Sequence, residues 1–167
     1  SNTISGIVNN LDELPFPNFD DYFTQIQELI SSADIKPLLP LESSRGCWWG
    51  QKKHCTFCGL NGLGISYRCK TEDRIFDELQ YLSNKYDIYE ILMVDNILPH
   101  QYFKKFIPQL SESKKYYIHY EVKSNLSENQ IESLYNAGVV EIQPGIESMS
   151  SAVLKLMEKG VTGLQNV

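Results

Sequence analysis

Three of the 4 cysteines in this chain lie in one short segment, residues 45–62, which reads RGCWWGQKKHCTFCGLNG. Seven residues separate Cys47 from Cys55, and Cys55 and Cys58 form a Cys-x-x-Cys pair. Thiolates bind zinc and iron–sulfur clusters, so this spacing predicts a metal centre. Three thiolates on a 4Fe–4S cluster leave one iron open to a small ligand, whereas a fourth from Cys69 would close a structural zinc site. The spacing alone leaves both interpretations open.

The residues around these cysteines are basic, although the chain as a whole is acidic. Residues 45–70 contain five Lys or Arg and no Asp or Glu, against a formal net charge of −6 for the chain. The acidic total argues against a general nucleic-acid binder, so we expect no nucleic-acid partner. The basic segment is either a solvated loop or a local positive field that suits an anionic cluster or a ligand carboxylate. Gly59, Gly62 and Gly64 would give flexible backbone close to the metal.

The composition is that of a globular domain, with 42% hydrophobic and 22% charged residues in 167. No apolar run approaches the length of a membrane span, and the first residues lack the apolar region of a signal peptide. We therefore expect a cytoplasmic chain with no membrane partner. In that compartment a Cys-x-x-Cys pair is typical of metal or redox chemistry rather than of a structural disulfide.

The elements that must position the cysteines alternate between strands and helices. Four apolar segments are typical of buried strands: IKPLLPLESS before the cysteines, and then IYEILMV, YYIHYEV and VVEIQP. A helical pattern follows each of the last three, and another lies between the first two. This alternation predicts an α/β fold with a parallel sheet and right-handed crossovers. We expect a partial (β/α) TIM-like barrel of about four β-α units over residues 37–167.

Local signals set several of the helix boundaries. Thr71 can cap the first of these helices, and its apolar residues fall on one face: Ile75, Leu79 and Leu82. SENQ, from Ser127 to Gln130, fits a capping box, and Pro108 must kink or shorten the helix expected over residues 101–110. Before the first strand, an acidic, proline-containing segment predicts an interdomain linker that runs into a short helix. Its apolar side would carry Phe19, Tyr22, Phe23, Ile26 and Leu29.

Polar residues gather where the predicted strands end. In parallel α/β sheets the carboxyl ends of the strands form one rim, and ligands bind there. Each of these residues alone is a plausible helix cap or loop residue, but together they predict a pocket that faces the cysteines. They are Asp95, Asn96, Glu121, Lys123, Asn125, Gln143, Gly145, Glu147 and Ser148. Trp48 and Trp49 would either line this pocket or pack over the loop.

The cysteine segment resembles the cluster loop of the radical S-adenosylmethionine (SAM) superfamily, with a longer first spacing than the usual Cys-x-x-x-Cys-x-x-Cys. Phe57 matches the aromatic position before the last cysteine. Together with YEVKSNLSENQIESLYNAGV, IQPGIESMS and LMEKGVTGLQNV, the segment resembles one branch, the cobalamin-dependent C-methyltransferases that mature ribosomally made peptides (RiPP maturation radical SAM proteins). The resemblance implies that residues 1–36 are a linker and leading helix from a missing cobalamin-binding domain. Residues 37–167 would then be a partial radical SAM barrel.

This resemblance implies an enzyme that reductively cleaves SAM at a 4Fe–4S cluster held by Cys47, Cys55 and Cys58, producing a 5′-deoxyadenosyl radical. The fourth iron would take the amino and carboxylate groups of SAM. Cobalamin would supply the methyl group, a precursor peptide would be the substrate, and a flavodoxin or ferredoxin would be the reductant. Two alternatives stay open: a radical SAM enzyme of another reaction type, such as methylthiolation or cyclisation, and a four-cysteine zinc domain without catalysis. No catalytic residue is assigned.

The resemblance also implies which group of SAM each residue of the rim would contact. Asp95 and Asn96 would meet the methionyl amino group, and Asp95 is the better candidate because a carboxylate complements an ammonium. Lys123 would meet the methionyl carboxylate, and Glu121, on the same strand face, would pair with Lys123 or bind the ligand. The ribose hydroxyls would be bound by Glu147, Ser148 and Gln143. The backbone around Phe57 would lie at the adenine edge.

Overall fold

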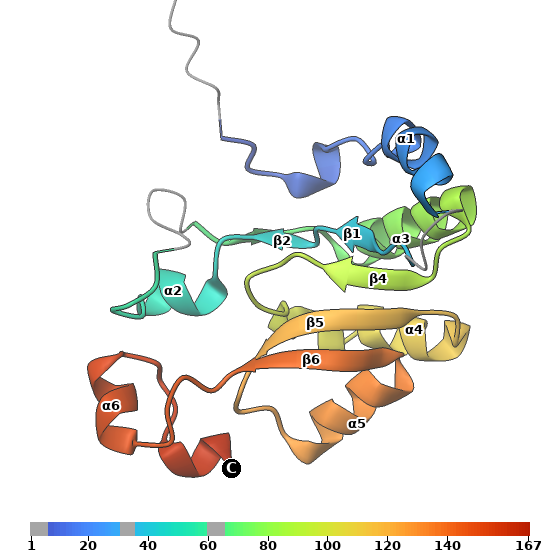
Figure 1. The fold of residues 1–167 in the computed structure, drawn as a ribbon. Helices are drawn as coiled ribbons and strands as arrows, with labels where there is room; N and C mark the ends of the chain where they lie inside the picture. Colours follow the sequence, from blue (N-terminus) through green and yellow to red (C-terminus); the bar gives the residue numbers. More distant parts are fainter. Residues whose placement is uncertain (1–6, 31–35, 60–65) are drawn as a thin grey trace, which may run out of the picture.

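Four parallel strands form the central sheet of the fold (Figure 1). The computed structural model describes residues 7–30, 36–59 and 66–167. The strand order is β1-β4-β5-β6, and each neighbouring pair is parallel. The strands are β1 (Leu39–Leu41), β4 (Glu90–Met93), β5 (Tyr117–Lys123) and β6 (Val139–Gly145). The predicted α/β class and the four-stranded parallel sheet are confirmed, and both are consistent with a partial (β/α) core.

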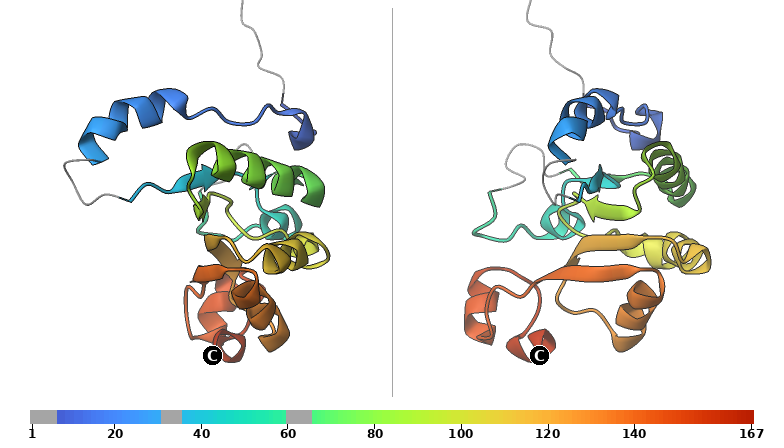
Figure 2. Two further views of the ribbon diagram at one scale, coloured as in Figure 1. Left: turned by 90° about the vertical axis from the view of Figure 1, so that its right-hand side faces the viewer. Right: turned by 45° about the vertical axis from the view of Figure 1, so that its right-hand side comes forward.

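The helices that connect these strands cover one face of the sheet (Figure 2). They are α3 (Glu72–Tyr86), α4 (Phe106–Ser113) and α5 (Glu128–Asn136). Alternate residues of β5 point to opposite faces, as the pleat requires. Ile118, Tyr120 and Val122 are buried in the core, whereas His119, Glu121 and Lys123 are half-buried on the other face. That second face therefore presents polar side chains toward the carboxyl end of the sheet.

The helix signals in the sequence are confirmed. Ile75, Leu79 and Leu82 of α3 are each no more than 1% exposed and pack in the core. The Thr71 side chain accepts a hydrogen bond from the backbone N–H of Arg74. Ser127 and Gln130 form the predicted capping box at the start of α5. Each cap satisfies backbone donors that the first turn of a helix leaves without partners.

The helix that contains Pro108 is shortened, as expected, and the turn that is lost is the one at its N-terminal end. The segment before it forms a separate 3-10 turn, η2 (His100–Phe103), and α4 begins only at Phe106. Pro108 is therefore the third residue of α4, in the first turn, where the missing N–H has no intrahelical acceptor. The helix expected over residues 101–110 is split at Lys104 and Lys105 for this reason.

Shorter elements surround the carboxyl end of the sheet and the N-terminal part of the chain. A two-stranded antiparallel pair, β2 (Ser44–Arg45) with β3 (Arg68–Cys69), extends beyond β1. The remaining elements are η1 (Leu11–Glu13), α1 (Asp20–Ile30), α2 (Trp48–Lys52), α6 (Ser151–Leu156) and η3 (Gly163–Asn166). Among the described residues, no helix has both the length and the apolar character needed to cross a membrane.

The segment before β1 packs along α3. Arg74 stacks on the Phe16 ring, with its guanidinium carbon 4.0 Å from the ring centre, and donates to the carbonyl of Leu14 at 2.6 Å. Phe19 and Phe23 pack against the core, as predicted. Tyr22 does not, since it is 49% exposed. The side chain of Leu29, also predicted on this side, lies outside the described part of the chain.

Candidate functional site

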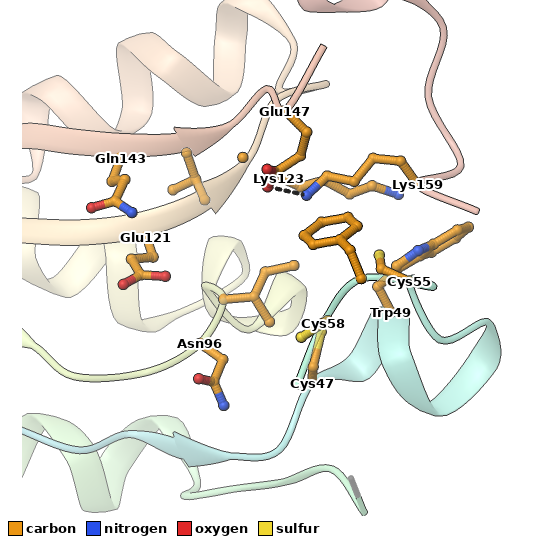
Figure 3. A pocket seen from close by; sticks show the side chains of 14 residues that line it. Cys47, Trp49, Cys55, Cys58, Asn96, Glu121, Lys123, Gln143, Glu147 and Lys159 are labelled. Atoms are coloured by element: carbon orange, nitrogen blue, oxygen red, sulfur yellow. Dashed lines mark hydrogen bonds and ion pairs between the residues drawn. The ribbon is translucent and has the colours of Figure 1, made fainter. Parts of the chain in front are cut away.

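A pocket of about 230 Å³ lies at the carboxyl end of the sheet, between the cysteine segment and the ends of β5 and β6 (Figure 3). Ten of the predicted site residues line it: Cys47, Cys55, Phe57, Cys58, Asn96, Glu121, Lys123, Gln143, Gly145 and Glu147. Four predicted residues do not line it, namely Gly59, Asp95, Asn125 and Ser148. The structure thus brings the three thiols and the polar rim to one cavity.

The cysteine segment begins directly after β2 and turns into the short helix α2. Cys47 is the N-cap of that helix, and its Sγ accepts a hydrogen bond from the N–H of Gly50 at 3.4 Å. The N–H of Cys58 donates to the carbonyl of Cys55 at 3.1 Å, which closes the turn of the Cys-x-x-Cys pair. Cys55 is buried, whereas Cys47 and Cys58 are half-buried. All three thiols therefore face the pocket from a single short segment.

Two other parts of the chain hold this segment in place. On one side, the indole N–H of Trp48 donates to the carbonyl of Leu98 at 3.1 Å. On the other, the indole N–H of Trp49 donates to the carbonyl of Glu158 at 3.2 Å, and the N–H of Thr56 donates to that of Met157 at 3.1 Å. Because these acceptors follow β4 and α6, the position of the thiols depends on segments far away in sequence.

Burial and charge act on Cys55 in opposite directions. Burial raises the pKa of the Cys55 thiol, and the neighbouring thiols of Cys47 and Cys58 add to this effect. The ammonium of Lys159 lowers it. A metal centre needs thiolates, so positive charge at this position favours the ligating form.

The number of thiols in the pocket matches a 4Fe–4S cluster that keeps one iron open. Among the described residues, no group of three or more His, Cys, Asp or Glu side chains is placed to hold one ion. A zinc ion requires all its sulfur ligands at about 2.3 Å from one point. In a 4Fe–4S cluster each thiolate binds a different iron, so the sulfurs lie around a larger body. Three thiols that line one cavity can serve as the three protein ligands of such a cluster.

Cys69, the proposed fourth zinc ligand, lies elsewhere. It belongs to β3 and pairs in register with Ser44, and it does not line the pocket. Burial raises the pKa of its thiol, and a hydrogen bond with Tyr67 partly opposes this. The structure does not bring Cys69 together with the other three cysteines, and it behaves as the half-buried thiol that a lone cysteine usually is.

Two lysines supply positive charge to the pocket. Lys123 Nζ lies 3.5 Å from the centre of a Trp49 ring and 5.6 Å from that of Trp48, which makes both tryptophans part of its surroundings. Burial lowers the pKa of Lys123, and the charge of Lys159 lowers it further. Lys159 forms an ion pair of 3.0 Å with Glu147. Glu121 and Lys123 share the strand face, as predicted, but the cation of Lys123 lies over the indoles.

Asn96 lines the pocket, whereas Asp95, the preferred candidate for the methionyl amino group, does not. Asn96 donates to the carbonyl of Gly46 at 3.3 Å. Asp95 is only 1% exposed and points into the core. Its Oδ1 accepts the backbone N–H groups of Ser43 and Ser44 at 2.8 and 2.7 Å, and its Oδ2 accepts the Tyr120 hydroxyl at 2.8 Å. The Asp95 side chain therefore fixes the backbone that leads from β1 into the cysteine segment.

The remaining predicted residues are placed by the strand register and by the turn after β6. Glu121 lies beside Gln143, and Lys123 lies beside Gly145, in the pairing of β5 with β6. Ser148 turns away from the pocket, and its hydroxyl accepts the N–H of Ser150 at 3.0 Å. Gly59 is exposed, and Gly62 and Gly64 lie outside the described residues.

Sequence reasoning missed Lys159 and the turn that carries it. A lysine at the end of a helix is usually explained by the helix dipole, so LMEKG gives no separate signal for a pocket residue. The structure shows a reason for the glycine as well. Gly160 has a φ of +71°, and a side chain there would collide with the Trp49 ring.

Replacing Gly160 by alanine is expected to destabilise the protein by about 2 kcal/mol, because the left-handed backbone disfavours a Cβ and the Trp49 ring would have to move. Denaturant unfolding measures the loss. Gly59→Ala is the matched control, since a Cβ there meets nothing within 4 Å, and it should change stability by less than about 0.5 kcal/mol. Equal losses for the two variants would contradict the contact between this turn and the cysteine segment.

The fold and the site define a class before any relative is considered: an α/β protein whose cofactor pocket lies at the carboxyl ends of parallel strands. A family model described as the radical SAM superfamily matches residues 41–165. This chain belongs to the radical SAM superfamily. Membership implies a 4Fe–4S cluster and S-adenosylmethionine as cofactors, and the three thiols of the pocket suit that cluster.

One curated relative is similar along nearly the whole chain. A protein of Pyrococcus horikoshii, named as an uncharacterized methyltransferase, is 26% identical over 168 residues, which cover 96% of this chain. The chain spans 34% of the length of that relative. No solved structure matches the chain.

Proposed function

We propose that this chain is the core of an enzyme that reductively cleaves SAM for the cobalamin-dependent C-methylation of a ribosomally made precursor peptide. The observation that carries the proposal is the pocket, in which three thiols face polar side chains at the carboxyl ends of β5 and β6. The methyltransferase name of the Pyrococcus relative supports the reaction class. The cobalamin and peptide parts rest on the resemblance of the cysteine and GIES segments to the peptide-maturing branch.

Cys47, Cys55 and Cys58 would hold the cluster as thiolates, leaving one iron without a protein ligand. When bound, the cluster supplies the electron that cleaves SAM to a 5′-deoxyadenosyl radical. The half-buried face of β5 gives Glu121 and Lys123 for the ligand, and Asn96 joins them from the loop after β4. The Trp49 indole and the Phe57 ring form the apolar part of the cavity wall. The protein thus positions the reacting groups while the cofactors perform the chemistry.

The proposal extends to the parts of the enzyme outside this pocket. Residues 1–36 would link the core to a cobalamin-binding domain, and the match to the longer Pyrococcus relative is consistent with such an arrangement. The reductant would be a flavodoxin or a ferredoxin in the cytoplasm. These assignments follow the resemblance alone.

The test uses the full-length enzyme that contains this chain, reconstituted with iron, sulfide and cobalamin, and supplied with SAM, dithionite and the precursor peptide. We expect 5′-deoxyadenosine and a peptide heavier by one methyl group. 5′-Deoxyadenosine without methyl transfer would indicate another radical reaction, such as methylthiolation or cyclisation. If an intact cluster gives neither product, the proposed function is wrong.

A further inference from the structure

Lys159 lines the pocket, and its ammonium group lies between a carboxylate and an aromatic ring. Its Nζ lies 3.0 Å from Glu147 Oε1 and 5.8 Å from the centre of the Phe57 ring. A Cβ on Gly145 would lie 2.9 Å from the same Nζ, so the ammonium packs directly against the backbone at the end of β6. The Lys159 side chain is 13% exposed. It is therefore a built part of the pocket wall rather than a solvated surface lysine.

The backbone next to Lys159 is bonded to the cysteine segment itself. Glu158 accepts from the Trp49 indole, and Met157 accepts from the N–H of Thr56, the residue after Cys55. The turn continues through Gly160, which packs on the Trp49 ring. These contacts keep the backbone that carries Lys159 next to the cysteine segment.

The charges that line the pocket divide into two lysines and two glutamates. Lys123 lies over the Trp49 indole on the β5 side, and Lys159 is paired with Glu147 on the β6 side. Figure 3 shows the lysines between Glu147 and the cysteines. Both lysines line the same cavity as the three thiols. Lys159 forms an ion pair with a carboxylate, whereas Lys123 lies over an indole ring. The net charge at the Lys159 position therefore depends on both Lys159 and Glu147.

We propose that Lys159 is a positioning residue whose ammonium raises the reduction potential of the cluster held by Cys47, Cys55 and Cys58. The proposal rests on the proposed function, because it requires that cluster. Reduction adds an electron to an anionic group, and a nearby cation stabilises the reduced state more than the oxidised state. Glu147 acts in the opposite sense, since its carboxylate offsets the same cation. Cluster potentials respond to net charge and to solvent exposure in this way.

The experiment is a potentiometric titration of the reconstituted chain in the absence of SAM, followed by electron paramagnetic resonance. Lys159→Met should shift the reduction equilibrium about tenfold toward the oxidised cluster, which is about 59 mV for one electron. Lys159→Arg keeps the charge and should restore most of the wild-type potential. Glu147→Gln should shift the potential upward, opposite to Lys159→Met. Lys155→Met is the control, because it removes the same charge from an exposed position on α6.

Opposite shifts for Lys159→Met and Glu147→Gln, with no shift for Lys155→Met, would support the proposal, because general damage to the pocket would not produce two signs. A Lys159→Met potential equal to that of the wild type or of Lys155→Met would overturn it. Shifts of the same sign at Lys159 and Glu147 would overturn it too. If the wild-type chain takes up no cluster, both this inference and the proposed function fail. If the shifts appear but no peptide is methylated, only the proposed function fails.

Discussion

Cys55→Ser is expected to bind less than one iron per chain after anaerobic reconstitution, whereas the wild-type chain binds about four. A serine hydroxyl does not replace a thiolate as a cluster ligand, and the two remaining thiols cannot hold the cluster from one short loop. Cys47→Ser and Cys58→Ser should behave in the same way, because all three thiols line one cavity. Iron and sulfide analysis, with the absorbance of the brown protein, measures the loss.

Cys69→Ser is the matched control for these variants. It replaces the same atom in a half-buried cysteine of β3 that does not line the pocket. It should keep the full iron content. Loss of metal in Cys69→Ser, with one zinc per chain in the wild type, would contradict the three-thiol cluster and favour a structural zinc site.

Asp95→Ala is expected to lower the free energy of unfolding by about 4 kcal/mol at pH 5, because it leaves buried donors without an acceptor. Those donors are the N–H groups of Ser43 and Ser44 and the Tyr120 hydroxyl. Asp95→Asn keeps an acceptor oxygen and adds an N–H donor, so it should cost less than about 1 kcal/mol. Urea unfolding of the two variants measures the difference. Equal losses would show that this network does not hold the start of the cysteine segment.

The same pair of proteins shows how Asp95 titrates. Burial raises its pKa from 3.8 to about 6, so the folded protein holds this proton more tightly than the unfolded chain does. The stability that Asp95 contributes is then greatest below pH 4 and is lost as the pH rises through 6, by about 3 kcal/mol at most. The wild type should therefore lose stability relative to Asp95→Asn between pH 4 and pH 7. A difference that does not vary with pH would contradict the raised pKa.

The contacts around Asp95 are consistent with a held proton. Its Oδ2, the Ser43 hydroxyl and the Tyr120 hydroxyl are all within hydrogen-bonding distance of one another. Each of these three hydrogen bonds needs one proton, and the two hydroxyl groups supply only two. A proton on the Asp95 carboxyl group supplies the third. An asparagine amide at this position would supply a donor in the same place, which is why the asparagine variant resembles the neutral acid.

Local rules explain why much of the fold was predictable. The stripe of Ile75, Leu79 and Leu82 and the capping box at Ser127 depend on residues within one or two helical turns of each other. The alternation of strands and helices then limits the topology to a parallel sheet. Tyr22 was placed wrongly because the helical pattern alone does not show how wide the covered face is.

The sequence predicts a site residue correctly where it shows which face of a strand the side chain lies on. Glu121 and Lys123 are two residues apart on one strand, so their shared face follows from the pleat. Asp95 and Asn96 are adjacent and follow the strand end, where the sequence does not show which of them faces the pocket. Lys159 could not be found, because its role depends on contacts with Phe57 and Glu147 that only the folded chain brings together.

The central claim is that three thiolates leave one iron of the cluster open to SAM. The most direct measurement is the electron paramagnetic resonance spectrum of the dithionite-reduced, reconstituted chain, recorded with and without SAM. We expect the g values to change when SAM is added, because its amino and carboxylate groups bind the open iron. An unchanged spectrum from a fully loaded cluster, or a chain that binds a single zinc through Cys69, would contradict the claim.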